Sequence, residues 1–170
     1  MLPKEMVGLM KQQTFLLRDC AEADEPVVLE IIKAAFEEQR GRVHPPSSAH
    51  HKTLAILQAE RQTARAIVAE IASAPPQLVG CIFYETKAES IYFSRLAVLP
   101  THRGQGIGAA LIGEVERRAA ALGARSVTLS VRVALTEQHT YYAKRGYQFV
   151  CYTMHPGFTE PTSMVMEKAL

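Results

Sequence analysis

Apolar residues recur every three or four positions in two stretches of the chain, which is the spacing of an amphipathic helix. The first stretch runs from Val28 to Phe36 and the second from Ile107 to Leu122, each with charged residues toward the other face. Glycine is a common residue just after a helix, and Gly41 and Gly123 stand at such positions. We therefore predict a helix in each stretch, the first ending by Gly41 and the second ended by Gly123.

Two weaker helices are predicted elsewhere. One begins near Leu54, after a loop-like segment from Gly41 to His51 that contains Pro45, Pro46 and two serines. The other covers Tyr141–Arg145, with Gly146 as the residue that follows the helix.

Short apolar runs bounded by turn residues predict seven strands. The turn-rich segment Ser73–Gln77 favours a hairpin, and the run after it extends the hairpin to a three-strand meander. The run at 127–131 is reached through the second long helix, so we expect it to lie parallel to the run at 91–98. The pattern predicts a mixed α/β sheet with strands at Phe15–Arg18, Ala66–Ala69, Leu78–Tyr84, Ile91–Val98, Val127–Val131, Tyr147–Tyr152 and Met164–Lys168.

Length and composition narrow the class of protein. With 170 residues, 48% of them hydrophobic and 21% charged, the chain predicts one globular domain over residues 1–170 and excludes disordered, collagen-like and coiled-coil proteins. The net charge of +2 gives no reason to expect a nucleic-acid partner. The near-terminal charges Lys4, Glu5 and Lys11 argue against a signal peptide, and no apolar run is long enough for a membrane span. Three widely spaced cysteines indicate a reducing compartment, so we expect a cytoplasmic protein without a membrane partner.

The segment from Arg103 to Gly108 has the composition of an anion-binding turn. It holds three glycines and lies between a predicted strand and the best predicted helix. Glycines let the backbone approach an anion closely, and the first turn of a helix presents unpaired N–H groups to it. Arg103 adds a positive charge. We expect this turn to bind a phosphate group; the alternative is a tight turn without a ligand.

A dinucleotide is the competing ligand, because Gly104-x-Gly106-x-x-Ala109 fits the fingerprint of dinucleotide-binding proteins. That fingerprint also requires an acidic residue about 20 positions later. Here the next predicted strand ends at Arg132. The sequence of a P-loop is also absent. A phosphate site of another kind is therefore the better interpretation.

The stretch Leu96–Gly108 resembles the acyl-CoA-binding motif of the GNAT superfamily of N-acetyltransferases, whose core is Q/R-x-x-G-x-G/A. Arg103, Gly106 and Gly108 fill its three defined positions. Farther on, Tyr142 precedes Gly146 by four residues, as in the Y-x-x-x-G-F motif of the same family, with Tyr147 in place of Phe. The predicted order of elements is also similar to a GNAT-like acyl-CoA-binding fold with six to seven strands.

This resemblance implies acetyl-CoA as the co-substrate. It implies that the end of the strand at Leu96, Ala97 and Val98 presents backbone groups to the pantetheine arm and the thioester oxygen. The pyrophosphate would lie on Arg103, Gly104, Gln105, Gly106, Ile107, Gly108 and Ala109. Tyr142 is the candidate general acid, because a phenol is suited to protonating a thiolate; the alternatives are the neighbouring Tyr141 or a core tyrosine. Leu135 departs from the family pattern, which often has an Asn there.

For several other residues the sequence supports both a role in the site and an ordinary structural role. Glu85 or Glu89 could relay a proton through water, with Ser94 or Ser130 holding that water, although surface carboxylates are the more common case. Tyr84, Tyr92, Phe93 and Phe158 are candidates for the walls of an acceptor pocket or for core packing. Cys81 and Cys151 are expected to be buried structural thiols. The pattern of His44, His50 and His51 is not that of a metal site, and we expect a mobile, solvated loop there.

The sequence predicts an acyltransferase that moves an acetyl group from acetyl-CoA to a primary amine of a small molecule or protein, by direct transfer in a ternary complex. A non-catalytic acyl-CoA-binding sensor or interaction domain is the second hypothesis, and a dinucleotide oxidoreductase is a distant third. The identity of the amine does not follow from the sequence. The resemblance is compatible with a homodimer.

Overall fold

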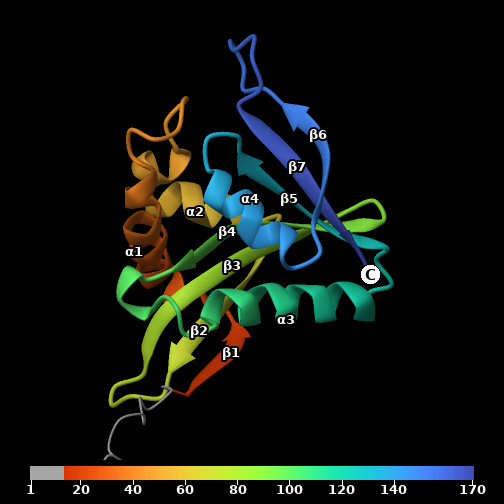
Figure 1. The fold of residues 1–170 in the computed structure, drawn as a ribbon. Coiled ribbons are helices and arrows are strands. Elements are labelled where there is room, and N and C mark those ends of the chain that lie inside the picture. Colours follow the sequence, from red (N-terminus) through yellow and green to blue (C-terminus); the bar gives the residue numbers. More distant parts are fainter. Residues whose placement is uncertain (1–13) are drawn as a thin grey trace, which may run out of the picture.

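The described part of the polypeptide forms one sheet of seven strands with helices on both faces (Figure 1). A computed structural model describes residues 14–170. The strands are β1 (Phe15–Asp19), β2 (Arg65–Ile71), β3 (Gln77–Lys87), β4 (Ser90–Val98), β5 (Ser126–Arg132), β6 (Gln148–Thr153) and β7 (Ser163–Ala169). The α-helices are α1 (Glu25–Phe36), α2 (Leu54–Glu60), α3 (Ile107–Ala121) and α4 (Thr136–Ala143).

The strand order is β1-β2-β3-β4-β5-β7-β6, and every neighbouring pair is antiparallel except β4 with β5. The hairpin of β2 and β3, the meander through β4 and the parallel pairing of β5 with β4 were all predicted from the sequence. The mixed α/β sheet is thereby confirmed.

Each face of the sheet is covered by its own helices. On one face the apolar side of α3, including Leu111 and Val115, packs with residues such as Ile82 and Val127. On the other face α1 and α2 bury residues such as Ile32 and Leu57 against Val68 and Phe83. Successive residues of a strand point to opposite faces, so strands covered on both sides are apolar throughout. This explains why β2 and β3 appear in the sequence as nearly continuous apolar runs.

The two parallel strands separate after their first three residues. Their pairing begins at Ser90 with Ser126 and ends at Tyr92 with Thr128, whereas both strands continue beyond that point. Against β3, strand β4 has an extra residue between Ser94 and Ala97, and Arg95 in this bulge has a φ of +52°. A bulge of this kind increases the local twist of its strand. The C-terminal halves of β4 and β5 therefore diverge.

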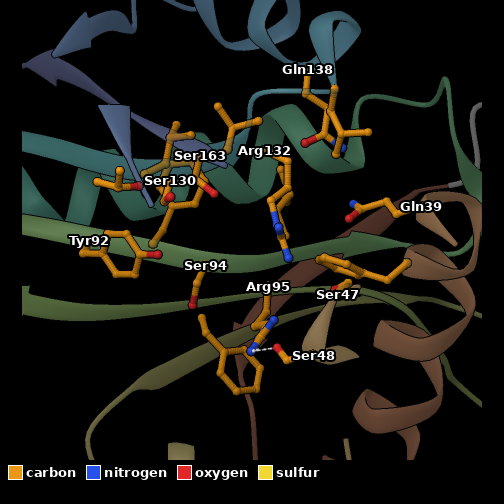
Figure 2. A pocket seen from close by; sticks show the side chains of 18 of the residues that line it. Gln39, Ser47, Ser48, Tyr92, Ser94, Arg95, Ser130, Arg132, Gln138 and Ser163 are labelled. Atoms are coloured by element: carbon orange, nitrogen blue, oxygen red, sulfur yellow. Dashed lines mark hydrogen bonds between the residues drawn. The ribbon is translucent and has the colours of Figure 1, made fainter. Parts of the chain in front are cut away.

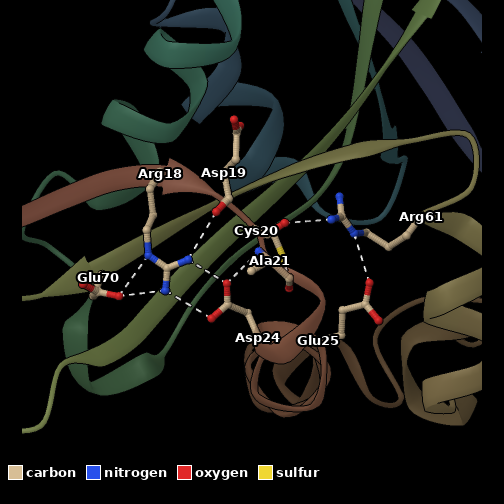
Figure 3. A network of polar contacts seen from close by, with 8 residues as sticks. All are labelled: Arg18, Asp19, Cys20, Ala21, Asp24, Glu25, Arg61 and Glu70. Atoms are coloured by element: carbon tan, nitrogen blue, oxygen red, sulfur yellow. Dashed lines mark hydrogen bonds and ion pairs between the residues drawn. The ribbon is translucent and has the colours of Figure 1, made fainter.

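A network of charged groups fixes α1 to the edge of the sheet (Figure 3). Arg18 of β1 donates to Asp24 at 2.6 and 3.1 Å and to Glu70 of β2 at 2.7 and 3.0 Å. Asp24 also accepts a hydrogen bond from the backbone N–H of Ala21 at 2.8 Å. The start of α1 is thus held to two strands at once, which positions the far end of the helix at the opening between β4 and β5.

Three expectations need correction. Helix α4 begins at Thr136, five residues earlier than predicted, because its first residues are mostly polar and give a weak apolar period. Cys151 is exposed, since β6 is an edge strand whose residues are all exposed. His50 is buried in a 3-10 turn at Ser48–His51 instead of lying in a solvated loop.

The segment that contains Lys4, Glu5 and Lys11, on which the argument about a signal peptide depends, lies outside the described residues. Within residues 14–170 no helix has the length and apolar character needed to cross a membrane.

Candidate active site

Two neighbouring cavities occupy the region where β4 and β5 diverge. The glycine-turn cavity, of about 500 Å³, is lined by the end of β4, the turn before α3 and part of α4. The inter-strand cavity, of about 600 Å³, lies between β4, β5, α1 and the β6–β7 connection. Five residues line both cavities: Phe36, Gln39, Leu96, Gln138 and Tyr142. The two spaces are therefore adjacent, with Tyr142 and Leu96 at their common boundary.

The glycine turn has the conformation of an anion cradle. Gly104 and Gly106 have φ values of +72° and +81°, a region that L side chains rarely adopt. Gly106 is the N-cap residue of α3. The first N–H groups of this helix, from Ile107 to Ala109, have no partner within the helix, and the positive end of its dipole faces the same direction. These residues fit a pyrophosphate.

Arg103 has a second role that the sequence did not indicate. Its guanidinium donates to the backbone oxygen of Ala35 at 3.2 Å and forms an ion pair with Glu38 at 2.5 Å. The side chain therefore ties the glycine turn to the end of α1. Part of its charge is balanced by Glu38, which lines the same cavity.

Gly108 accommodates a close approach of α4. A Cβ atom at this position would lie 3.0 Å from the hydroxyl oxygen of Tyr141. The Tyr141 ring is held by Arg145, whose guanidinium carbon lies 3.5 Å from the ring centroid. Burial raises the pKa of the Tyr141 phenol. Tyr141 thus lines the glycine-turn cavity, whereas Tyr142 reaches both cavities.

Tyr142 is buried and tightly packed. Its ring makes edge or tilted contacts with Phe93, Tyr141 and Tyr147, with centroids 5.3 to 6.1 Å apart. Within residues 14–170 its hydroxyl forms no hydrogen bond, whereas the buried Tyr147 donates to Glu116 at 2.9 Å. Burial raises the pKa of Tyr142, so the phenol stays protonated at neutral pH. A protonated, unbonded hydroxyl at the boundary of two cavities can act as a proton donor.

The structure places nine of the ten predicted cofactor residues along the glycine-turn cavity. The exception is Gln105, which is exposed and does not line it. Leu96, Ala97 and Val98 lie where β4 has lost its parallel neighbour, so the edge of β4 that faces β5 has no strand partner there. Backbone groups on such an edge are available to a bound molecule.

Some of the residues that line the inter-strand cavity were candidates from the sequence, and others were not (Figure 2). Tyr92, Phe93, Ser94, Ser130 and Glu85 were candidates and line it. Glu89 does not, because it forms an exposed ion pair with Arg125 at 3.0 Å. Tyr84 is buried in the core of the α3 face. The cavity also contains Arg95, Arg132 and Glu60, which carried no recognisable motif.

The remaining candidates have packing roles. Cys81 is fully buried, as predicted, and burial raises the pKa of its thiol. Leu135, at the position where the family often has Asn, is buried beside the inter-strand cavity, and its carbonyl accepts from the N–H of Gln138 at 2.9 Å. His44 packs against Phe158. Among the described residues no group of three His, Cys, Asp or Glu side chains is placed to hold a metal ion.

Comparison with known proteins identifies the family. A model of the acetyltransferase (GNAT) family matches residues 27–147. The chain belongs to the GNAT acetyltransferase family. Membership assigns acyl transfer from an acyl-CoA, and the glycine turn described above is the part of this GNAT protein that suits the pyrophosphate of coenzyme A.

Solved structures share the fold across almost the whole chain. The PaiA N-acetyltransferase from Thermoplasma acidophilum, in complex with coenzyme A, has 17% identity and a TM-score of 0.73, with 92% of this chain and 99% of that chain covered. A GCN5-related N-acetyltransferase from Rhodopseudomonas palustris has 25% identity and a TM-score of 0.70, covering 96% and 100%. A ribosomal-protein-alanine N-acetyltransferase from Brucella melitensis has 21% identity and a TM-score of 0.66, covering 91% and 99%. No curated protein matches this GNAT chain significantly.

Proposed function

We propose that this protein transfers the acetyl group of acetyl-CoA directly to a primary amine, with both substrates bound at once. The observation that carries this proposal is the position of Tyr142, whose unbonded hydroxyl belongs to a side chain that lines both cavities. The glycine-turn cavity would hold the cofactor and the inter-strand cavity the amine. The thioester would then lie at the boundary, beside Leu96 and Tyr142.

The chemistry balances with groups at this boundary. The neutral amine attacks the thioester carbonyl, a C–N bond forms and the C–S bond breaks. Tyr142 donates its proton to the departing thiolate. Unpaired backbone N–H groups near Leu96 stabilise the negative charge on the carbonyl oxygen. Holding the two reactants together supplies a large part of the rate.

Glu85 is the carboxylate best placed to take the proton of the amine, through a water molecule. It lines the inter-strand cavity, and within residues 14–170 its one ion pair is with the exposed Lys87, at 3.1 Å. The other carboxylate of the cavity, Glu60, already forms ion pairs with both Lys52 and Arg95. Tyr92 and Ser94, on the neighbouring strand, are positioned to hold the water (Figure 2).

Thermal unfolding with added ligands tests the donor. We expect acetyl-CoA and CoA to raise the midpoint and NAD⁺ and NADP⁺ to leave it unchanged; a ligand at 100 times its Kd contributes about 2.7 kcal/mol. Transfer is then tested with a panel of primary amines. The reaction is monitored through the loss of thioester absorbance, because a thiol reagent for free CoA would also modify Cys151. Stabilisation by acetyl-CoA without consumption by any amine would favour the acyl-CoA-binding sensor instead. Stabilisation by the nicotinamides alone would contradict the whole assignment.

A further inference from the structure

The guanidinium of Arg132 is the least satisfied charged group at the site. Arg132 is the last residue of β5 and lines the inter-strand cavity. Its Nη1 atom is buried and has no hydrogen-bond partner among the described residues. Nη2 donates only to the backbone oxygen of Pro46, at the long distance of 3.5 Å. Leaving a buried N–H donor of a charged group without a partner is costly, so such a donor usually has one when the protein works.

The surrounding groups do not supply that partner. Figure 2 shows Arg132 extending toward the side of the cavity where Arg95 lies, whereas the guanidinium of Arg95 is directed at Ser48. Arg95 is itself compensated, because it donates to Glu60 at 3.2 Å and to Ser48 at 3.1 Å. His155 also lines the cavity, and burial and the charge of Arg132 lower its pKa, so it is neutral. The charge of Arg132 is therefore not balanced by any side chain of the cavity.

We infer that Arg132 binds the carboxylate of the acceptor, so that the substrate is a small primary amine of the amino-acid class. This inference rests on the proposed function. A planar guanidinium matches a carboxylate with two parallel hydrogen bonds. One uncompensated arginine suits a single negative charge better than a dianionic phosphate. The amine of the same molecule would face Tyr142, on the cofactor side of the cavity.

The lining and size of the cavity agree with such a substrate. Hydroxyl and amide side chains line this cavity together with Arg132 and Tyr142. They include Ser94, Ser130 and Gln138, which are labelled in Figure 2. A volume of about 600 Å³ is within the range of small-molecule sites. A free amino acid and the end of a short peptide both carry a carboxylate. They differ in how far it lies from the amine, so an experiment that includes both separates them.

The first arm of the test compares matched acceptors. L-amino acids, their carboxamides and dipeptides are offered with acetyl-CoA, and kcat/KM is measured from thioester loss. We expect at least tenfold higher values for the acids than for the amides. If dipeptides have the same kcat/KM as free amino acids, the ends of peptides are also acceptors. In Arg132→Met the preference should disappear, mainly through KM for the acids, whereas values for the amides change little.

The second arm needs no turnover. The CoA-saturated protein is unfolded thermally with N-acetyl amino acids or with their N-acetyl amides. We expect the acids to raise the midpoint of the wild type and not that of Arg132→Met. Arg125→Gln is the control for loss of a positive charge, because Arg125 is 78% exposed in its side chain and pairs with Glu89.

The outcomes separate the two proposals. If amines are acetylated but acids and amides react equally, or if Arg132→Met keeps the preference, the carboxylate role is wrong and the acetyltransferase stands. If no amine of the panel reacts, the thermal unfolding experiment decides. The role of Arg132 is overturned if the N-acetyl amino acids and their amides raise the midpoint equally, or if neither raises it. If acetyl-CoA itself does not bind, the proposed function fails first.

Discussion

At the scale of single residues, two of the buried tyrosines of the α3 face, Tyr142 and Tyr147, differ in their hydrogen bonds. Tyr147 donates to Glu116 at 2.9 Å, whereas the hydroxyl of Tyr142 has no partner within residues 14–170. The Tyr142 side chain lines both cavities, so its hydroxyl is accessible to water or to a bound molecule. A hydroxyl without a protein partner at this boundary is free to bond a substrate, as the proposed acid role requires.

Removing that hydroxyl gives the first prediction. In Tyr142→Phe we expect kcat to fall by about 10²-fold or more, because the thiolate loses its proton donor. The free energy of unfolding should stay the same or rise slightly, and stabilisation by acetyl-CoA should persist. Tyr152→Phe, which changes an exposed ring on β6, is the matched control. An unchanged kcat in Tyr142→Phe would assign the acid role to another group.

Gly108 allows a second prediction at this scale. In Gly108→Ala the new Cβ would meet the Tyr141 hydroxyl at 3.0 Å, so the ring must move within the glycine-turn cavity. We expect affinity for acetyl-CoA, measured by titration calorimetry, to fall by about tenfold. Adding Tyr141→Phe should restore it, since the clashing oxygen is removed.

The control for this variant is in the same helix. A Cβ at Gly113 meets nothing within 4 Å. Gly113→Ala should therefore leave affinity unchanged and add about 0.5–1 kcal/mol of stability, the usual gain in helix propensity. Equal losses of affinity in both variants would show that helix rigidity, and not the approach of Tyr141, controls binding.

At the scale of elements, the position of α1 depends on the ion pair between Arg18 and Asp24. The Arg18 guanidinium lowers the pKa of the Asp24 carboxyl. A carboxyl whose pKa is lower in the folded state stabilises the protein above its unfolded pKa of about 3.9, and that stabilisation is lost as the pH falls through the folded value. Because α1 also lines both cavities through Phe36, this pair supports the site from a distance.

We predict that Asp24→Asn lowers the free energy of unfolding by about 1–2 kcal/mol at pH 7, since charge-assisted hydrogen bonds are lost in a partly exposed setting. The difference from the wild type should be constant above pH 5 and shrink below pH 4, as seen in urea titrations at several pH values. Glu22→Gln, which changes an exposed acid in the same turn, should have no effect at either pH. A gap that stays undiminished as the pH falls below 4 would mean that the charge of Asp24 is not responsible.

At the scale of the whole molecule, the three cysteines differ in their accessibility to solvent. Cys151 is exposed on the edge strand β6, whereas Cys20 and Cys81 are buried and burial raises the pKa of both thiols. Reactivity requires an accessible thiolate. The native protein should therefore react with a thiol reagent at one fast site, which Cys151→Ser removes.

Modification of the other two cysteines should be much slower and should follow opening of the structure. Mass spectrometry of the partly modified protein identifies the site. Two or three fast thiols in the native state would mean that the α1 face, where Cys20 and Cys81 lie, opens locally far more readily than its packing implies.

Several features of the protein follow from the sequence because their causes are local. Neighbouring residues alone produce the helical period of α3, the apolar runs of the meander and the glycines of the turn. The sheet, its parallel pair of strands and the family motif could therefore be predicted. The start of α4 could not, because its polar first turn is placed by the buried Leu135 and not by an apolar period. The exposure of Cys151 also escaped prediction, since it depends on β6 being the last strand of the sheet.

The sequence by itself determined the elements, the family and the residues of the glycine turn. Only the tertiary structure decided what faces the space between β4 and β5, where Arg95, Arg132 and Glu60 come together from distant segments. The physical reason is the bulge at Arg95 and the loss of pairing after Tyr92, which open a gap whose lining depends on strand divergence. The class of reaction is thus encoded in contiguous residues, and the acceptor in residues that meet only in the fold.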